Sequence, residues 1–136
     1  MATILVTGAS GMLGQHLVPM LRSKGHVVLS PPREELDLTD SEATSNFIET
    51  NPIDAVVHCA AYVAGIASST ATKHHSFDSN VSMGMNLIRA CIEHDVATML
   101  NVGSATVYPS EAPQPLSESS LGQGAFEGPI EGYALS

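Results

Sequence analysis

The chain has 136 residues, of which 43% are hydrophobic; this suits one domain with one core and excludes a disordered chain. Fourteen acidic residues outnumber five basic ones, and the formal net charge of −9 argues against nucleic acid as a partner. Without an apolar run of about 18 residues or a secretory signal pattern, we expect a cytoplasmic protein with no membrane contact. Cys59 and Cys91 are too few for a disulfide framework, and no metal site is expected.

Two elements are predicted at the start of the chain. The apolar run over residues 3–6 is typical of a buried parallel strand. Apolar residues at helical spacing then predict a helix over 12–24, with basic residues in its last turn and Gly25 as a stop signal. Pro19 lies inside this helix and should either bend it or be tolerated near its first turns.

Short strands alternate with helices further along the chain. Three strands are expected, at residues 27–29, 55–57 and 98–102. A capping box of Thr39 and Glu42 predicts a helix that runs to about Thr50. The small polar residues 62–75 predict a loop, and a long helix is expected over 77–94.

The alternation of four strands with helices predicts an α/β fold, a Rossmann-like doubly wound parallel sheet. One face of the 77–94 helix is expected to be apolar, with the side chains of Val81, Met85, Leu87, Ile88 and Cys91. Residues 109–129 are rich in Pro, Gly and Ser and predict a long connection. Because the fourth strand ends the sheet, we expect it to expose an unpaired edge.

Three glycines follow the first strand directly and open the first helix. Gly8, Gly11 and Gly14 form the pattern T-G-x-x-G-x-x-G. In a dinucleotide site, the first glycine permits a tight turn, the second lets a diphosphate approach the backbone, and the third lets the helix pack on the strand. The pattern therefore predicts a dinucleotide site, and a merely tight turn is the alternative.

The residues after the 27–29 strand bear on the choice of coenzyme. An acid there would accept the ribose hydroxyl of NAD, whereas a cation would accommodate the extra phosphate of NADP. The chain places Arg33 there and has no carboxylate before Glu34, which favours NADP. A solvated loop arginine is the alternative.

Several motifs together resemble those of the extended short-chain dehydrogenase/reductases that act on nucleotide sugars. They are TGASGMLG at 7–14, LDLTD at 36–40, HCAA at 58–61, Asn80, GSATVYP at 103–109 and YALS at 133–136. AAYVAGI and GPIEGYALS are most similar to members that epimerise C3 and C5 and reduce C4 of GDP-4-keto-6-deoxymannose. The resemblance covers the whole chain and implies that residues 1–136 are the truncated N-terminal part of an NADP-binding Rossmann domain, without the C-terminal substrate part.

The resemblance also implies roles for individual residues. Together with Arg33, the expected cofactor contacts are Gly8, Ser10, Gly11, Met12, Leu13, Gly14, Asp37, Leu38, His58, Ala60, Ala61 and Tyr133. Asp37 and Leu38 would border the adenine, and Asn80 would be a structural or proton-relay residue. The implied substrate is a nucleotide sugar, and the implied assembly is a homodimer.

Ser104 and Tyr133 are the catalytic pair that the resemblance implies, with Thr106 beside them. A tyrosine hydroxyl can donate a proton to a carbonyl oxygen that receives a hydride, while a serine hydroxyl holds the same oxygen. The family activates this tyrosine with a lysine four residues later, which would fall just beyond Ser136. The epimerising members also have a cysteine acid/base where this chain has Thr106, a hydroxyl that does not titrate near neutrality.

Three functions fit the sequence. The first is NADP-dependent 3,5-epimerisation and 4-reduction of a GDP-4-keto-6-deoxy sugar. The second is 4-epimerisation or 4-reduction of another nucleotide sugar, which Thr106 fits equally well. The third is an NADP-binding module without turnover.

Overall fold

The computed structural model divides into two compact units. It describes residues 1–63, 66–126 and 131–136, with the backbone alone over 66–72. The first unit comprises residues 1–61 and 82–102, and the second comprises residues 62–81 and 103–136.

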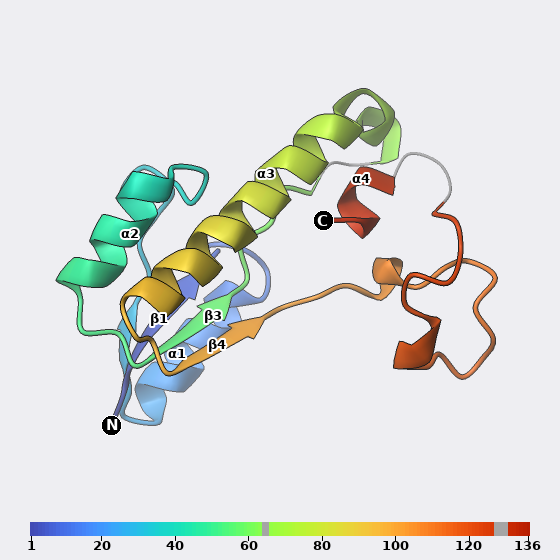
Figure 1. Cartoon of the computed structure of the whole chain (residues 1–136). Helices are drawn as coiled ribbons and strands as arrows, with labels where there is room; N and C mark the ends of the chain where they lie inside the picture. The colour runs from blue at the N-terminus through green and yellow to red at the C-terminus, as the bar shows by residue number, and fades with distance from the viewer. Residues whose placement is uncertain (64–65, 127–130) are drawn as a thin grey trace. The chain divides into compact units, whose positions relative to one another are not determined.

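The first unit is built on a parallel sheet with the strand order β2-β1-β3-β4 (Figure 1). The strands are β1 (Thr3–Thr7), β2 (Val27–Leu29), β3 (Ala55–His58) and β4 (Thr98–Asn101). They alternate with the helices α1 (Gly14–Ser23), α2 (Ser41–Thr50) and α3 (Ile66–Glu93), the last of which begins in the second unit. In this register Leu5 of β1 lies opposite Leu29 of β2 and Val56 of β3. The predicted Rossmann-like α/β fold is confirmed.

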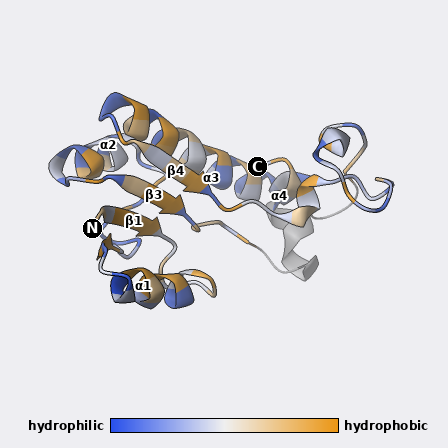
Figure 2. Ribbon diagram, turned by 90° about the horizontal axis from the view of Figure 1, so that it is seen from below, coloured by the Kyte–Doolittle hydropathy of each residue, from blue (hydrophilic) through white to orange (hydrophobic). Residues whose placement is uncertain are grey.

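The core of the first unit follows from the alternation of side chains along β1, because successive residues of a strand point to opposite faces of a sheet. Ile4 and Val6 pack with Val18 of α1 on one face. Leu5 packs on the other face with a cluster that includes Leu87 of α3. Figure 2 agrees: α1 lies on one side of the apolar strands, and α2 lies with α3 on the other.

The start of α3 corrects the prediction of a loop over 62–75. The helix begins at Ile66, so that His74 and His75 are helical. Small and polar residues such as Ala, Ser and Thr resemble a loop in composition, but no proline interrupts residues 66–93. Once a helix has formed downstream, adding a residue costs far less than nucleation, so it extends through such a segment.

The predicted apolar face of α3 is right for Leu87 and Cys91 and wrong for Met85 and Ile88. Leu87, Ala90 and Cys91 are buried in the core, whereas Met85 and Ile88 are exposed. The buried residues have the spacing i, i+3 and i+4 and therefore share one stripe of the helix. Met85 and Ile88 lie outside this stripe, because each residue turns the helix by about 100°.

The predicted capping box of α2 is also wrong, by one residue. Asp40 is the N-cap, and its Oδ1 accepts the N–H of Ala43 at 3.0 Å. Thr39 instead donates its N–H and its hydroxyl to Asp37, at 3.0 and 2.7 Å. A carboxylate forms the stronger, charge-assisted bond to a helix N–H, so the aspartate caps the helix in preference to the threonine.

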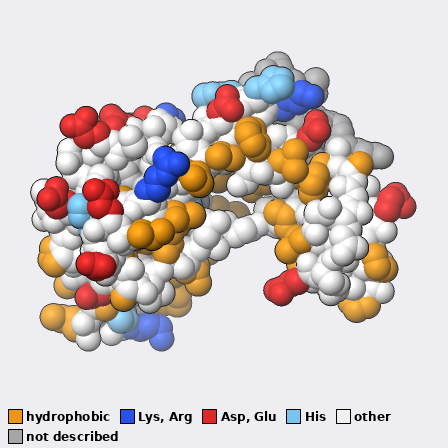
Figure 3. Space-filling view, in the orientation of Figure 1, with side chains coloured by type: hydrophobic (Ala, Val, Ile, Leu, Met, Phe, Trp, Pro, Cys, Tyr) orange, Lys and Arg blue, Asp and Glu red, His pale blue; other side chains and the backbone are white. Residues whose placement is uncertain are grey.

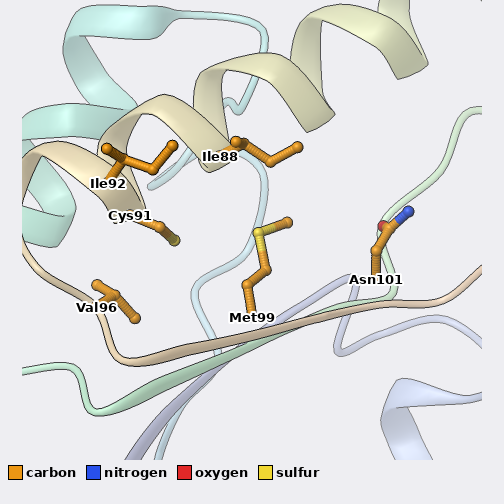
Figure 4. A pocket seen from close by; sticks show the side chains of 6 residues that line it. All are labelled: Ile88, Cys91, Ile92, Val96, Met99 and Asn101. Atoms are coloured by element: carbon orange, nitrogen blue, oxygen red, sulfur yellow. The ribbon is translucent and has the colours of Figure 1, made fainter.

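β4 is an edge strand of the described sheet, as expected. A pocket of about 330 Å³ lies beside it, lined by side chains of α3, β4 and the link between them: Ile88, Cys91, Ile92, Val96, Met99 and Asn101 (Figure 4). Figure 3 shows hydrophobic side chains gathered on this face of the unit. The unit therefore has an exposed apolar surface next to the outer edge of β4, which pairs with no described strand.

The second unit contains the first half of α3 and the chain after β4. Its elements are the 3₁₀ helices η1 (Ala105–Val107) and η2 (Glu118–Ser120) and the short helix α4 (Glu131–Ala134). The predicted long connection over 109–129 is confirmed as far as residue 126, and η2 is the one helical turn in this part of it. Residues 127–129 lie outside the described residues.

α4 packs on α3 so closely that a Cβ on Gly132 would overlap the backbone of Lys73. Lys73 also forms an ion pair of 3.5 Å with Glu131.

Truncating Leu87 tests how α3 faces the sheet. Leu87 is 0% exposed, so we expect Leu87→Ala to lower the free energy of unfolding by about 2–5 kcal/mol through lost burial and a cavity. Ile88→Ala is the matched control, because Ile88 is 45% exposed and its truncation should cost less than about 1 kcal/mol. Urea unfolding followed by circular dichroism measures both values. Equal losses for the two variants would contradict the assigned orientation.

Candidate cofactor and catalytic sites

The turn between β1 and α1 brings the three predicted glycines together. Gly8 has φ +66°, a left-handed conformation that favours glycine. A Cβ on Gly8 would lie 2.6 Å from the backbone nitrogen of Ala60, and one on Gly14 would overlap the carbonyl oxygen of Gly8. Gly11 donates its N–H to that same oxygen at 3.0 Å. The turn is therefore closed by backbone contacts that side chains would prevent.

The start of α1 presents unused hydrogen-bond donors. Among the described residues, the N–H groups of Met12, Leu13 and Gly14 donate to no protein acceptor. They lie at the positive end of the helix dipole, and the first turn of α1 contains no acidic residue. Ser10, Met12 and Leu13 are exposed, which leaves this end accessible. Such an arrangement fits the diphosphate of a dinucleotide.

Thr7 joins the ends of β1 and β3 beneath this turn. Its Oγ1 lies 2.7 Å from Nδ1 of His58 and accepts the N–H of Ala60 at 3.3 Å. His58 is 6% exposed, and this burial lowers the pKa of its imidazole. Ala61, the next residue of the predicted site, is exposed. Sequence reasoning missed Thr7, although a polar residue at the end of an apolar strand is a signal that could have found it.

Arg33 and Asp37 lie together in the segment after β2. Oδ1 of Asp37 accepts the two hydrogen bonds from Thr39, which are the main reason that the pKa of this carboxyl lies below its ordinary value. Arg33 forms an ion pair of 3.3 Å with Oδ2, and its side chain is 73% exposed. The neighbouring Leu38 is buried in the core. The arginine is thus held at the surface by a weak, solvent-screened contact.

In the second unit, Ser104 caps the 3₁₀ helix η1. Its Oγ accepts the backbone N–H of Thr106 at 3.3 Å and the hydroxyl of Thr106 at 2.9 Å. Both side chains are half-buried. The structure thereby brings together two of the three residues predicted to be catalytic.

Tyr133, the third, is placed by the packing of α4. This helix contacts η1, so the tyrosine is on an element next to the turn that Ser104 caps. Gly132 lets α4 approach the backbone of Lys73, and Tyr133 itself is half-buried. Sequence reasoning missed Gly132; a glycine directly before the expected catalytic tyrosine was the available signal.

Asn80 uses both the oxygen and the nitrogen of its side-chain amide within the second unit. Its Oδ1 accepts the N–H of Tyr62 at 2.7 Å, and its Nδ2 donates to the carbonyl of Tyr62 at 3.2 Å and to Oγ of Ser136 at 3.1 Å. Because both ends of the amide are engaged by the protein, this geometry favours a structural role over a proton relay.

Among the described residues, no group of three His, Cys, Asp or Glu side chains is arranged to hold a metal ion. No helix in this part of the chain is long and apolar enough to cross a membrane. The homodimer and the cytoplasmic location stay predictions.

Comparison with known proteins agrees with this geometry. The profile of the NAD dependent epimerase/dehydratase family matches residues 4–136. The chain belongs to this family. The chain is similar to two GDP-L-fucose synthases. That of Azorhizobium caulinodans is 34% identical over 133 residues, and that of Escherichia coli (strain K12) is 35% identical over 134 residues. Each alignment covers 98% of this chain, but 43% and 42% of those proteins.

A solved structure of a similar protein extends the comparison. The GDP-mannoheptose C4 reductase of Campylobacter jejuni, with NADP bound, superimposes with a TM-score of 0.92 at 27% identity. The alignment covers 98% of this chain and 40% of that one. The chain therefore spans less than half the length of the relatives that it matches. The resemblance that its motifs carry is confirmed.

Replacing Gly8 tests whether dinucleotide binding requires a residue without a Cβ at this position of the turn. If the turn holds a pyridine dinucleotide, we expect Gly8→Ala to weaken binding of NADPH or NADH by the full-length protein at least roughly tenfold, because the new Cβ meets Ala60 and the left-handed φ is unfavourable. Gly25→Ala is the matched control: it has φ +83° but no atom within 4 Å of the added Cβ. Calorimetric titration measures binding, and unfolding curves establish that each variant is folded. Equal losses in both variants would contradict the steric explanation.

The buried His58 predicts a dependence of stability on pH. Above the ordinary pKa of 6.5 the histidine is neutral in both the folded and the unfolded chain, and its contribution is constant. As the pH falls below 6.5, the unfolded chain takes up the proton first, because the folded pKa is lower. The free energy of unfolding then decreases, by at most about 1.4 kcal/mol per pH unit.

His58→Asn isolates this contribution, because an asparagine amide can still reach Thr7 but does not titrate. We expect the variant to lose less stability than the wild type between about pH 6.5 and 5, a range above the titration of carboxylates. Urea unfolding at several pH values provides the measurement, with the exposed His74 replaced by asparagine as the control. An unchanged pH slope in His58→Asn would show that His58 does not carry the effect.

Proposed function

We propose that the protein to which this chain belongs uses NADPH to reduce the C4 keto group of a GDP-linked sugar. The observation that carries the proposal is the contact of α4, which bears Tyr133, with the η1 turn that Ser104 caps. It places two hydroxyl-bearing residues on adjacent elements of one unit. The names of the similar GDP-L-fucose synthases and of the GDP-mannoheptose C4 reductase support a GDP-linked substrate.

Each of the two hydroxyls has a role in this reaction. The bound reduced nicotinamide supplies the hydride. Tyr133 donates its phenolic proton to the carbonyl oxygen of the substrate as that oxygen becomes an alcohol. Ser104 donates a hydrogen bond to the same oxygen and stabilises the negative charge that develops on it.

The first unit provides the binding of the coenzyme. The N–H groups of Met12, Leu13 and Gly14 bind the diphosphate, and Arg33 binds the 2′-phosphate that distinguishes NADP from NAD. The ion pair of Arg33 with Asp37 is exposed and worth about 0–1 kcal/mol, so the guanidinium can turn to a phosphate at little cost. A comparison of NADPH with NADH as the reductant tests this preference.

Thr106 favours reduction without epimerisation at C3 and C5. Epimerisation requires an acid/base that removes and returns carbon-bound protons, and such a group works best with a pKa near the operating pH. A threonine hydroxyl does not titrate in that range, and that of Thr106 already donates to Ser104. Complete GDP-L-fucose synthase activity is the second candidate, favoured by the identity of 34–35% to enzymes of that name.

The experiment follows NADPH absorbance with the full-length protein and GDP-4-keto-6-deoxymannose. We expect the wild type to consume NADPH, and Tyr133→Phe and Ser104→Ala to lower kcat/KM by about 10²–10⁴-fold. Ser110→Ala, an exposed serine of the same unit, should leave kcat/KM unchanged.

The outcomes separate the candidate functions. Solvent deuterium at C3 and C5 of the product would favour complete GDP-L-fucose synthase activity. Faster turnover of UDP- or dTDP-linked keto sugars would overturn the GDP assignment. Binding of NADPH with no consumption of it by any keto sugar would favour a binding module and refute the reductase.

A further inference from the structure

The hydroxyl of Ser104 has both of its acceptor positions occupied within the protein. A serine hydroxyl has two acceptor lone pairs and one O–H donor. The backbone N–H of Thr106 occupies one acceptor position at 3.3 Å, and the hydroxyl of Thr106 occupies the other at 2.9 Å. The position left on the Ser104 oxygen is its own hydrogen.

We propose that Thr106 is a positioning residue that commits Ser104 to donate its hydrogen to the substrate. This inference rests on the proposed reductase function. With both lone pairs filled, Ser104 cannot accept a hydrogen bond from water or from a substrate hydroxyl, and its O–H points away from Thr106. The substrate oxygen becomes a stronger hydrogen-bond acceptor during the reduction, because negative charge accumulates on it.

The position of Thr106 suits this role. It lies in the 3₁₀ turn that Ser104 caps, so the capping bond from its backbone N–H fixes its distance from the serine. Its branched Cβ restricts χ1, which keeps the hydroxyl directed at Ser104. Because this hydroxyl donates to Ser104, it cannot simultaneously donate a proton to the substrate. Thr106 thus acts through Ser104 rather than as an acid itself.

The predicted signature is an effect on kcat more than on KM. A hydrogen bond that strengthens as the oxygen becomes charged contributes to the transition state more than to the bound substrate. Thr106→Val keeps the branched shape and the backbone N–H but removes the hydroxyl bond. We expect it to lower kcat by about tenfold, the loss that corresponds to one ordinary hydrogen bond. KM and the Kd for NADPH should change less than about threefold.

A double-mutant cycle in the full-length protein tests whether Thr106 acts through Ser104. Thr106→Val should reduce kcat in the wild type but have no further effect in the Ser104→Ala background, because its only target is then absent. Thr106→Ser restores a hydroxyl and should recover most of the wild-type kcat. Thermal unfolding of each variant establishes that the folded state is retained.

The results distinguish a failure of the positioning role of Thr106 from a failure of the reductase function. A wild type that consumes NADPH together with a Thr106→Val variant of equal kcat would overturn the positioning role and leave the reductase function intact. An equal loss in the Ser104→Ala background would also overturn it, because Thr106 would then act independently. A wild type that reduces no keto sugar would overturn the reductase function and the inference with it.

Discussion

The approach of Gly8 to the backbone of Ala60 is the constraint on which the first unit depends. It requires a residue without a Cβ at the end of β1, and it joins the turn after β1 to the turn after β3. Thr7 secures the same junction, since its hydroxyl contacts His58 and accepts the N–H of Ala60. The free N–H groups at the start of α1 are presented from this junction. In the proposed function, this junction would bind a diphosphate through backbone packing rather than through a charged side chain.

The free energies of the contacts indicate that the glycine turn matters more than the ion pair of Arg33. A left-handed backbone costs a residue other than glycine roughly 1–2 kcal/mol, before any steric overlap is added. The exposed ion pair between Arg33 and Asp37 contributes about 0–1 kcal/mol. On the proposed function, we therefore expect the glycine turn to matter more for dinucleotide binding than Arg33, whose expected role is to select between NADP and NAD.

The sequence predicts most of the sheet, because buried strands and the glycine turn are local patterns. The wrong predictions have two physical origins: competition between neighbouring residues for the same hydrogen bond, and tertiary packing that no local pattern contains. Thr39 and Asp40 are both good capping residues; the spacing of Thr39 to Glu42 favours the threonine, but the carboxylate of Asp40 forms the charge-assisted bond to the helix N–H. Met85 and Ile88 are apolar like Leu87, and what separates them is which face of α3 packs on the sheet.

The residues of the candidate sites also divide into those that local motifs predict and those that only tertiary contacts reveal. Gly8 and Tyr133 lie in motifs that can be read along the chain. The contact of Thr7 with His58 and that of Gly132 with Lys73 join residues far apart in sequence, so no local pattern contains them. The bond from Thr106 to Ser104 is local, but it depends on the 3₁₀ conformation of η1, which the sequence does not specify.

The two cysteines bear on the chemistry that this chain can supply. Burial raises the pKa of the thiols of Cys59 and Cys91, so neither forms a thiolate readily near neutral pH. They are the only cysteines of the chain, so no activated thiol compensates here for the threonine at position 106. A hydroxyl that donates to Ser104 suits the stabilisation of an oxyanion, whereas proton abstraction from carbon needs a stronger base. These residues therefore support the proposed reduction of a carbonyl rather than inversion of its neighbouring carbons.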